Sequence, residues 1–134
     1  MEFSELKVGM KDSVSKTITE TDIILFAGIT TDLNPAHINE EYAKTTIFKR
    51  RIAHGMLSAG LISAALGTKL PGEGSIYMGQ ELKFLAPVYA EDTITAIVEV
   101  IELIPEKSRV ILKTICVNQN GVEVITGKAT LMKK

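Results

Sequence analysis

The sequence predicts an α+β domain in which a curved antiparallel sheet of about five strands surrounds one long central helix. Residues 56–66 are apolar on nearly every side, and a helix of this kind in a soluble protein is buried on most of its faces. The second half of the chain contains four β-rich segments without helical periodicity. Short turns between them predict an antiparallel meander. The 134 residues suit one such domain, residues 1–134, and no linker divides them.

The elements follow in order along the chain. Residues 12–18 alternate weakly and predict a first strand. Thr19 predicts the start of a helix that runs to about residue 30, because a hydroxyl cap precedes acids in the first turn. Asn39 predicts the cap of a second, short helix. The four β-rich segments are residues 75–88, 92–104, 109–119 and 122–133, and Asn120-Gly121 between the last two is a strong hairpin signal.

Composition excludes several classes of protein. The chain has 15 basic and 16 acidic residues, whereas a nucleic-acid binder usually shows a basic excess. Its beginning lacks the pattern of a signal peptide, and the apolar stretch is shorter than the ~20 residues that a membrane-spanning helix needs. A single cysteine, Cys116, excludes an internal disulfide and a multi-thiolate metal site. We therefore expect a soluble, cytoplasmic domain that binds neither nucleic acid nor membrane.

The segment T-D-L-N-P-A-H, residues 31–37, contains the first candidate site. Pro35 interrupts helical geometry, so we expect a bend that can bring Asp32 and His37 to the same side. An acid and a base within reach of one water molecule can take a proton from it and deliver one elsewhere. The alternative is that Asp32 caps a turn and the backbone satisfies His37. A metal site is disfavoured, because two candidate ligands fall short of the usual three or four.

Gly55 marks the start of the apolar helix and is the second candidate. The first N–H groups of a helix have no internal partners, and together with the helix dipole they can stabilise an oxyanion or an enolate. The alternative is that Gly55 serves close packing and that His54 hydrogen-bonds locally. The basic cluster of Lys49, Arg50 and Arg51 directly precedes this helix; it is either a phosphate contact or a solvated turn.

These motifs together resemble a known family. D-x-N-P-x-H at residues 32–37 with the following Ala43, and I-A-H-G-M at residues 52–56, resemble the R-specific enoyl-CoA hydratases, the MaoC-like or hydratase 2 branch of the hot-dog fold. G-S-I-Y-M-G-Q at residues 74–80 and F-x-x-P-V at residues 84–88 are similar too. The resemblance covers nearly the whole chain. It implies hydration of trans-2-enoyl-CoA to (R)-3-hydroxyacyl-CoA.

Residue by residue, the resemblance implies that Asp32 takes a proton from water as its oxygen attacks C3, and that His37 supplies the proton to C2. The backbone N–H of Gly55 would contact the thioester oxygen. Leu66 and Leu131 would line the acyl pocket, and the basic cluster would meet coenzyme A phosphates. The substrate-binding residues implied in this way are Asn34, Ser63, Leu66, Leu131, Arg50 and Arg51. No cofactor is implied, since coenzyme A is part of the substrate.

The chain departs from the family pattern at two positions. Asn39 stands where many members carry an acid, and Arg51 stands where some carry proline. Asparagine caps a helix as well as aspartate does, so we expect the local geometry to be kept. Arg51 changes the loop before the central helix and makes the coenzyme A phosphate contact an open question.

The resemblance also implies a homodimer or a higher homo-oligomer. Five strands leave open sheet edges, and pairing those edges satisfies their backbone groups. Two alternative functions stay open: a 3-hydroxyacyl dehydratase that acts on acyl carrier protein, and a non-catalytic hot-dog protein that binds acyl-CoA. A hot-dog thioesterase is disfavoured, because such enzymes usually carry an acid on the central helix and this chain has none between Met56 and Leu66.

Overall fold

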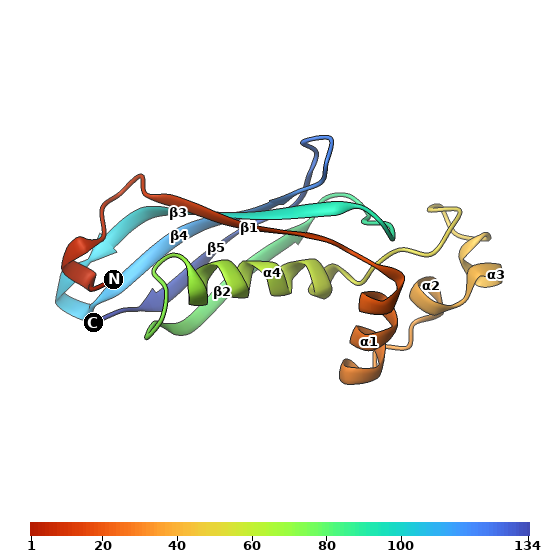
Figure 1. Ribbon diagram of the computed structural model, residues 1–134, viewed down its shortest axis with the longest axis horizontal. Coiled ribbons are helices and arrows are strands. Elements are labelled where there is room, and N and C mark those ends of the chain that lie inside the picture. Colours follow the sequence, from red (N-terminus) through yellow and green to blue (C-terminus); the bar gives the residue numbers. More distant parts are fainter.

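The computed structural model describes all residues of the chain, 1–134, as one α+β domain (Figure 1). Five strands and four α-helices make up the fold, with two short 3-10 turns, η1 (Phe3–Glu5) and η2 (Pro105–Lys107). The strands are β1 (Lys11–Thr17), β2 (Ile76–Phe84), β3 (Thr93–Ile104), β4 (Arg109–Val117) and β5 (Glu123–Met132). The helices are α1 (Glu20–Thr30), α2 (Pro35–Ile38), α3 (Glu40–Ala43) and α4 (Gly55–Thr68).

The five strands form one antiparallel sheet in the order β1-β3-β4-β5-β2. The predicted five-stranded sheet and the hairpin at Asn120-Gly121 are confirmed: Asn118 N–H donates to Val122 O at 3.0 Å between β4 and β5, and Gly121 has a φ of 76°. Such a positive φ favours glycine.

The expected meander is correct for β3, β4 and β5 and wrong for β2. This strand pairs with β5 at the far edge and does not pair with β3. The connection 85–92 contains Pro87 and is too long for a tight hairpin. Its backbone groups bond elsewhere: Val88 O accepts from Ala53 N at 2.7 Å, and Glu91 N donates to Ile18 O at 2.6 Å. The connection therefore bonds both to the segment that precedes α4 and to the residue that follows β1.

The helix α4 packs along the concave side of the sheet (Figure 1) and carries the central part of the core. Its buried residues are Ser58, Ala59, Ile62, Ala65 and Leu66. The alternating residues of β3 lie under it, as predicted from their period of two.

The expectation that α4 is buried on most of its faces is wrong for the single chain. Met56 is 56% exposed, and Gly60, Ser63, Ala64 and Gly67 on the same side are exposed as well. The sheet covers only one side of the helix, so its opposite face stays open.

The three helices α1, α2 and α3 lie beyond the N-terminal end of α4 and project from the sheet (Figure 1). We call residues 19–53 the helical extension. Each of its helices has a side-chain cap: Thr19 Oγ1 accepts from Asp22 N at 3.1 Å, Asn34 Oδ1 from Ala36 N at 3.0 Å, and Asn39 Oδ1 from Tyr42 N at 3.1 Å. The predicted caps at Thr19 and Asn39 are confirmed.

The longest helix, α4, has 14 residues. None of the helices combines the length and the hydropathy that a membrane-crossing helix requires.

Candidate active site

A cavity of about 450 Å³ lies between the helical extension, the N-terminal end of α4 and the connection that follows β2. Its polar lining consists of Asp32, His37, His54 and Ser58, beside the backbone of Gly55. The remaining lining residues are mainly apolar: Phe48, Ile52, Ala53, Met56, Phe84, Leu85, Ala86, Pro87, Val88, Val124 and Ile125. A largely apolar cavity of this size with a few converging polar groups is typical of a site for a small molecule.

The bend predicted at residues 31–37 is present and brings Asp32 to the cavity. Thr31 ends α1 in a left-handed conformation with a φ of 66°. The Thr30 hydroxyl then accepts from Asp32 N at 3.1 Å, and Asn34 N donates to Asp32 Oδ1 at 3.3 Å. Pro35 starts the new helix α2, a position that proline tolerates because the missing N–H has no partner there. Asp32 is exposed and borders the cavity.

His37 lies opposite in α2 and is buried, with 8% of its surface exposed. Its Nδ1 is 2.7 Å from the carbonyl oxygen of Ile52. Since a carbonyl only accepts, Nδ1 carries the hydrogen, and Nε2 is the nitrogen left for other partners. A carboxylate oxygen of Asp32 and ring nitrogens of His37 and His54 lie within 4.8 Å of one another.

His54 belongs to the same cluster and was not predicted as a site residue. Its Nε2 donates to the backbone oxygen of Asp32, 22 residues away, at 3.0 Å. The alternative of a local hydrogen bond for His54 is therefore wrong. Its ring lies 3.9 Å from the ring of His37, with 31° between their planes. The sequence signal available was its place directly before the glycine that starts the apolar helix.

Gly55 is the first residue of α4, as predicted. Neither its N–H nor that of Met56 donates to a backbone carbonyl, so both are free at the positive end of the helix dipole. A Cβ atom on Gly55 would lie 2.6 Å from the ring of Phe84. Glycine therefore allows the close approach of an aromatic ring at the cavity wall, in addition to leaving these donors accessible.

The three clustered side chains are poorly arranged for a metal ion. A histidine binds a metal through a lone pair in its ring plane, at about 2.0–2.1 Å. Two rings stacked at 3.9 Å with 31° between their planes cannot both direct such a lone pair at one ion. One nitrogen of each ring is also committed to a backbone carbonyl. The cluster is therefore better suited to proton transfer than to metal binding.

Cys116 cannot serve as a nucleophile near neutral pH. Burial raises the pKa of its thiol to about 12, and its Sγ donates weakly to Ser58 O at 3.7 Å. The thiol therefore stays protonated, and thiolate chemistry is excluded.

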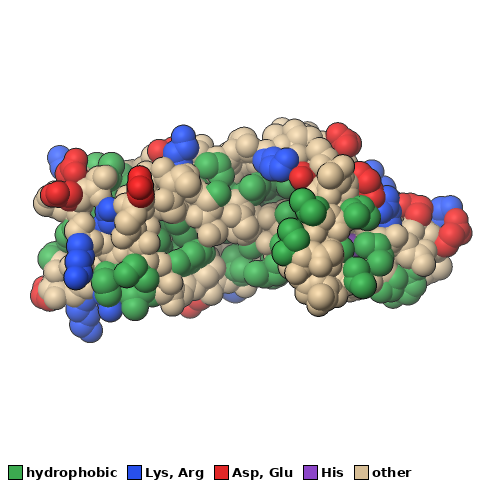
Figure 2. Space-filling view, turned by 60° about the horizontal axis from the view of Figure 1, so that its bottom comes forward, with side chains coloured by type: hydrophobic (Ala, Val, Ile, Leu, Met, Phe, Trp, Pro, Cys, Tyr) green, Lys and Arg blue, Asp and Glu red, His purple; other side chains and the backbone are tan.

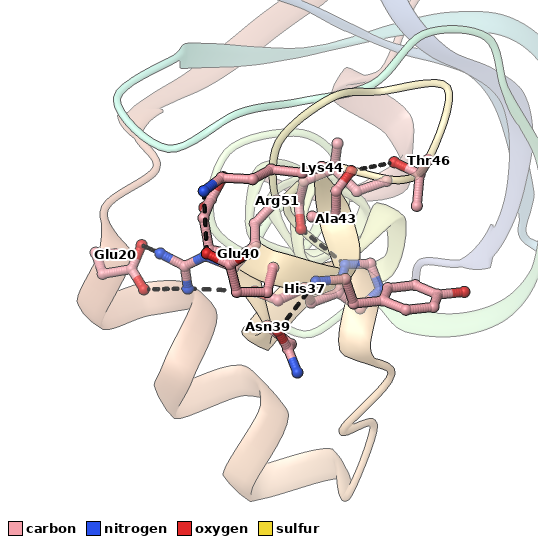
Figure 3. Close-up of polar contacts among 11 residues, drawn as sticks. Glu20, His37, Asn39, Glu40, Ala43, Lys44, Thr46 and Arg51 are labelled. Carbon is pink, nitrogen blue, oxygen red and sulfur yellow. Dashed lines mark hydrogen bonds and ion pairs between the residues drawn. The ribbon is translucent and has the colours of Figure 1, made fainter.

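Arg51 is held within the protein by two carboxylates (Figure 3). It contacts Glu20 of α1 at 2.6 and 2.9 Å and Glu40 of α3 at 3.2 Å. Hydrogen bonding to Glu20, followed by that to Glu40, raises the pKa of Arg51 above its usual value. Its guanidinium is thus already neutralised, which argues against the predicted contact with a coenzyme A phosphate. Arg50 is exposed and lies over the ring of Tyr89, 3.8 Å from its centre.

The other residues implied by the resemblance do not border this cavity in the single chain. Asn34 caps α2 and bonds to Asp32, so its contribution is to the shape of the bend. Ser63 lies on the open face of α4, about 12 Å along the helix from Gly55. Leu66 and Leu131 are 0% and 1% exposed and belong to the core.

Comparison with known proteins shows the family and the fold of this chain. Residues 3–123 match the family model described as "MaoC like domain". An (R)-specific enoyl-CoA hydratase of Rhodospirillum rubrum is 58% identical over 97% of this chain and 90% of its own length, and one of Aeromonas caviae is 43% identical over 98% of both. The unliganded R-hydratase PhaJ1 of Pseudomonas aeruginosa superimposes with a TM-score of 0.93 at 48% identity, covering 98% of this chain and 84% of that one. The chain therefore belongs to the MaoC-like family, with the hot-dog fold of the R-hydratases.

Proposed function

We propose that this chain is an (R)-specific enoyl-CoA hydratase, which adds water reversibly to trans-2-enoyl-CoA and forms (R)-3-hydroxyacyl-CoA. The observation that carries the proposal is the position of Asp32 and His37, within 4.8 Å of each other on one cavity beside the free N–H groups of α4. Relatives of 58% and 43% identity that carry the name of this activity support it.

In the proposed reaction, one water molecule lies between Asp32 and His37. Asp32 accepts a proton from the water while its oxygen forms a bond to C3. The π electrons of the double bond move toward the thioester, and His37, which starts the reaction with a hydrogen on each ring nitrogen, delivers its Nε2 proton to C2. One O–C3 bond and one C2–H bond form, and the proton left on Asp32 returns to His37, so that the reaction consumes only water. Each positioned acid or base typically contributes about 10²–10⁴ in rate.

The negative charge that develops on the thioester oxygen would be stabilised by the N–H of Gly55. A preorganised donor of this kind contributes about 10²–10³ in rate, because the donor needs no rearrangement during the reaction. The apolar lining, including Phe48, Phe84 and Val124, would hold the acyl chain. No cofactor or metal takes part, so turnover should be unchanged by EDTA.

The enzyme is proposed to act as a homodimer. The edge strand β2 exposes Ile76, Tyr77 and Met78, and Met56 is exposed on the open face of α4. Figure 2 shows hydrophobic groups on the face that carries α4, with charged side chains mostly toward the two ends and the upper edge. A second copy paired along β2 would satisfy the unpaired backbone groups of this strand. It would also bring Ser63, which the resemblance implies as a substrate-binding residue, close to the interface. Light scattering should give twice the 14.6 kDa chain mass, and the double variant Ile76→Lys/Met78→Lys should be monomeric.

A second candidate is dehydration of 3-hydroxyacyl groups on acyl carrier protein. Mitochondrial dehydratases of that description from Solanum lycopersicum and Arabidopsis thaliana are 35% identical over 95% and 93% of this chain. The exposed Arg50, two residues after the cavity-lining Phe48, is the observation in its favour, since carrier proteins are acidic. Direct competition between coenzyme A and carrier-protein substrates of the same acyl length decides between the two.

The test of the main proposal is hydration of crotonyl-CoA, followed by the loss of enoyl absorbance, with chiral analysis of the product over a C4 to C12 series. We expect only the (R) product. His37→Gln should lose turnover by at least about 10²-fold, whereas Lys44→Gln, an exposed control in the same extension, should retain it. An (S) product, or full activity of the His37 variant, rejects the proposal.

A further inference from the structure

His54 occupies the junction between the helical extension and α4. It is the N-cap residue of α4 and is 2% exposed. The residue before it is anchored to the rest of the fold, because Ala53 N donates to Val88 O at 2.7 Å. The imidazole of His54 is thus attached to a rigid point and extends from there toward the bend that carries Asp32.

The hydrogen bond from His54 to the Asp32 backbone is the only long-range hydrogen bond of the bend. Residues 31–34 otherwise form hydrogen bonds only within residues 30–37. The bond from His54 Nε2 to Asp32 O, at 3.0 Å, is the single hydrogen bond that joins these residues to a distant part of the sequence. The position of the Asp32 backbone therefore depends on this one side chain.

The faces of the His54 ring make the second set of contacts. The ring of His37 lies 3.9 Å away at 31°, and the ring of Phe26 in α1 lies 4.9 Å away at 58°. His54 thus contacts the acid of the catalytic pair through its edge and the base through its face. It also links both to α1.

The hydrogen bonding of His54 assigns its tautomer. Nε2 must carry a hydrogen, because its partner is a carbonyl oxygen. Nδ1 is buried and has no partner in the protein. In the neutral Nε2–H tautomer no N–H is left without an acceptor, and a buried donor without an acceptor is costly. His54 is therefore built to donate one hydrogen bond and to fill space, not to shuttle protons.

We infer that His54 is a positioning residue that sets the distance between Asp32 and His37. This inference rests on the proposed function, since it concerns the geometry of the proposed reaction. A catalytic group displaced by about 1 Å can lose about 10²-fold in rate. Substrate binding is affected less, because the apolar residues that would hold the acyl chain, among them Phe48, Phe84 and Val124, are unchanged.

The test separates the two contacts of His54. His54→Phe keeps a ring for stacking and removes the donor; we expect kcat to fall about 10²-fold while KM changes less than about threefold. His54→Gln keeps a donor and should recover about tenfold of that loss. The control is Val110→Ala, a 0% exposed position in β4 that should lower the melting temperature and leave kcat per folded molecule unchanged.

A double variant tests whether His54 acts through Asp32. Asp32→Asn/His54→Phe should be no slower than Asp32→Asn alone, within about threefold, because residues that act as one unit are not additive. Independent losses that multiply would overturn the inference. So would an unchanged kcat in His54→Phe, or no recovery by glutamine.

Nitrogen-15 NMR of the wild-type imidazoles provides a readout that needs no turnover. We expect the His54 hydrogen on Nε2, and faster hydrogen exchange of the Asp32 and Leu33 amides in His54→Phe than in Val110→Ala. A hydrogen on Nδ1, or unchanged exchange, overturns the inference even if the variants fold poorly. Absence of hydratase activity in the wild type would instead reject the proposed function and leave these two measurements to decide the role of His54.

Discussion

Different interactions stabilise the two regions of the molecule, the sheet with α4 and the helical extension. The cluster of 21 buried hydrophobic residues lies mainly in the strands and α4. In the three helices of the extension only Ile23, Ala27, His37 and Ala43 are buried, and several large hydrophobic residues there are exposed. Specific polar contacts order it instead. Arg51 binds two carboxylates and His37 bonds to Ile52 O within the extension, and His54 at the start of α4 donates to Asp32 O.

If the proposed site is correct, this difference separates the parts of the chain on which stability and function depend. A packed core resists deformation and supplies most of the free energy of folding. A region with few buried contacts can open locally at lower cost. With the proposed catalytic pair, Asp32 and His37, on the extension, the cavity would admit a substrate without disturbing the core. Changes in the two regions should therefore have separable effects on turnover and stability.

The largest effect is expected from Asp32→Asn. Removing the proposed base should lower kcat for crotonyl-CoA by about 10²–10⁴, while the melting temperature stays close to that of the wild type because Asp32 is exposed. Glu41→Gln, another exposed acid of the extension, is the matched control and should keep its turnover. An equal loss in both variants would mean that charge in the extension, and not this carboxylate, matters.

The next largest effect is expected from a substitution in the core, which should change the free energy of unfolding and not turnover. Leu112→Ala, at a 0% exposed position of β4, should lower the free energy of unfolding by about 2–5 kcal/mol, measured by urea denaturation. Leu25→Ala is the same substitution at a 58% exposed position of α1 and should cost less than about 0.5 kcal/mol. Similar losses in both would contradict the division between core and extension.

Gly55→Ala tests the boundary between the helical extension and α4. The new methyl group would lie 2.6 Å from the ring of Phe84, so the ring or the start of α4 must move. We expect kcat/KM to fall about tenfold, and Phe84→Leu in the same chain to restore part of it. Gly28→Ala in α1 meets no atom within 4 Å and should instead stabilise the protein by roughly 0.5–1 kcal/mol.

The smallest effect concerns the anchor of α1. Hydrogen bonding from the Thr19 backbone, followed by Lys16, lowers the pKa of Asp22 below 3.8. A lowered folded-state pKa gives stability that is present above the unfolded pKa and is lost as the pH falls through the folded value. Asp22→Asn should therefore cost about 0.5–1 kcal/mol at pH 7, and this cost should disappear once the pH lies well below the folded-state pKa of Asp22. Glu106→Gln, exposed in η2 and without an ion pair, should show no such pH dependence in urea titrations.

Local pattern predicted much of the fold, because strand alternation and helix caps act over a few residues. The predicted segment 92–104 became β3 (Thr93–Ile104), and Thr19 and Asn39 cap their helices. The partner of β2 was missed, since periodicity does not say which strand lies beside which. His54 was missed for a similar reason. Its hydrogen bond goes to a main-chain oxygen 22 residues away, which requires no particular side chain at position 32.

The order of strands in the sheet has a consequence for how the site forms in time. Lys11 pairs with Glu99, and Ile76 pairs with Met132, so both edges of the sheet close only when distant parts of the chain meet. Folds dominated by such non-local pairings are slow, typically milliseconds to seconds. The helical extension lies between these two closures along the chain. Backbone hydrogen bonds to the connection 85–92 hold both of its ends, at Ile18, just before it, and at Ala53, its last residue. Catalytic competence should therefore be among the last properties to appear during refolding, after the hairpins of β3, β4 and β5 have formed.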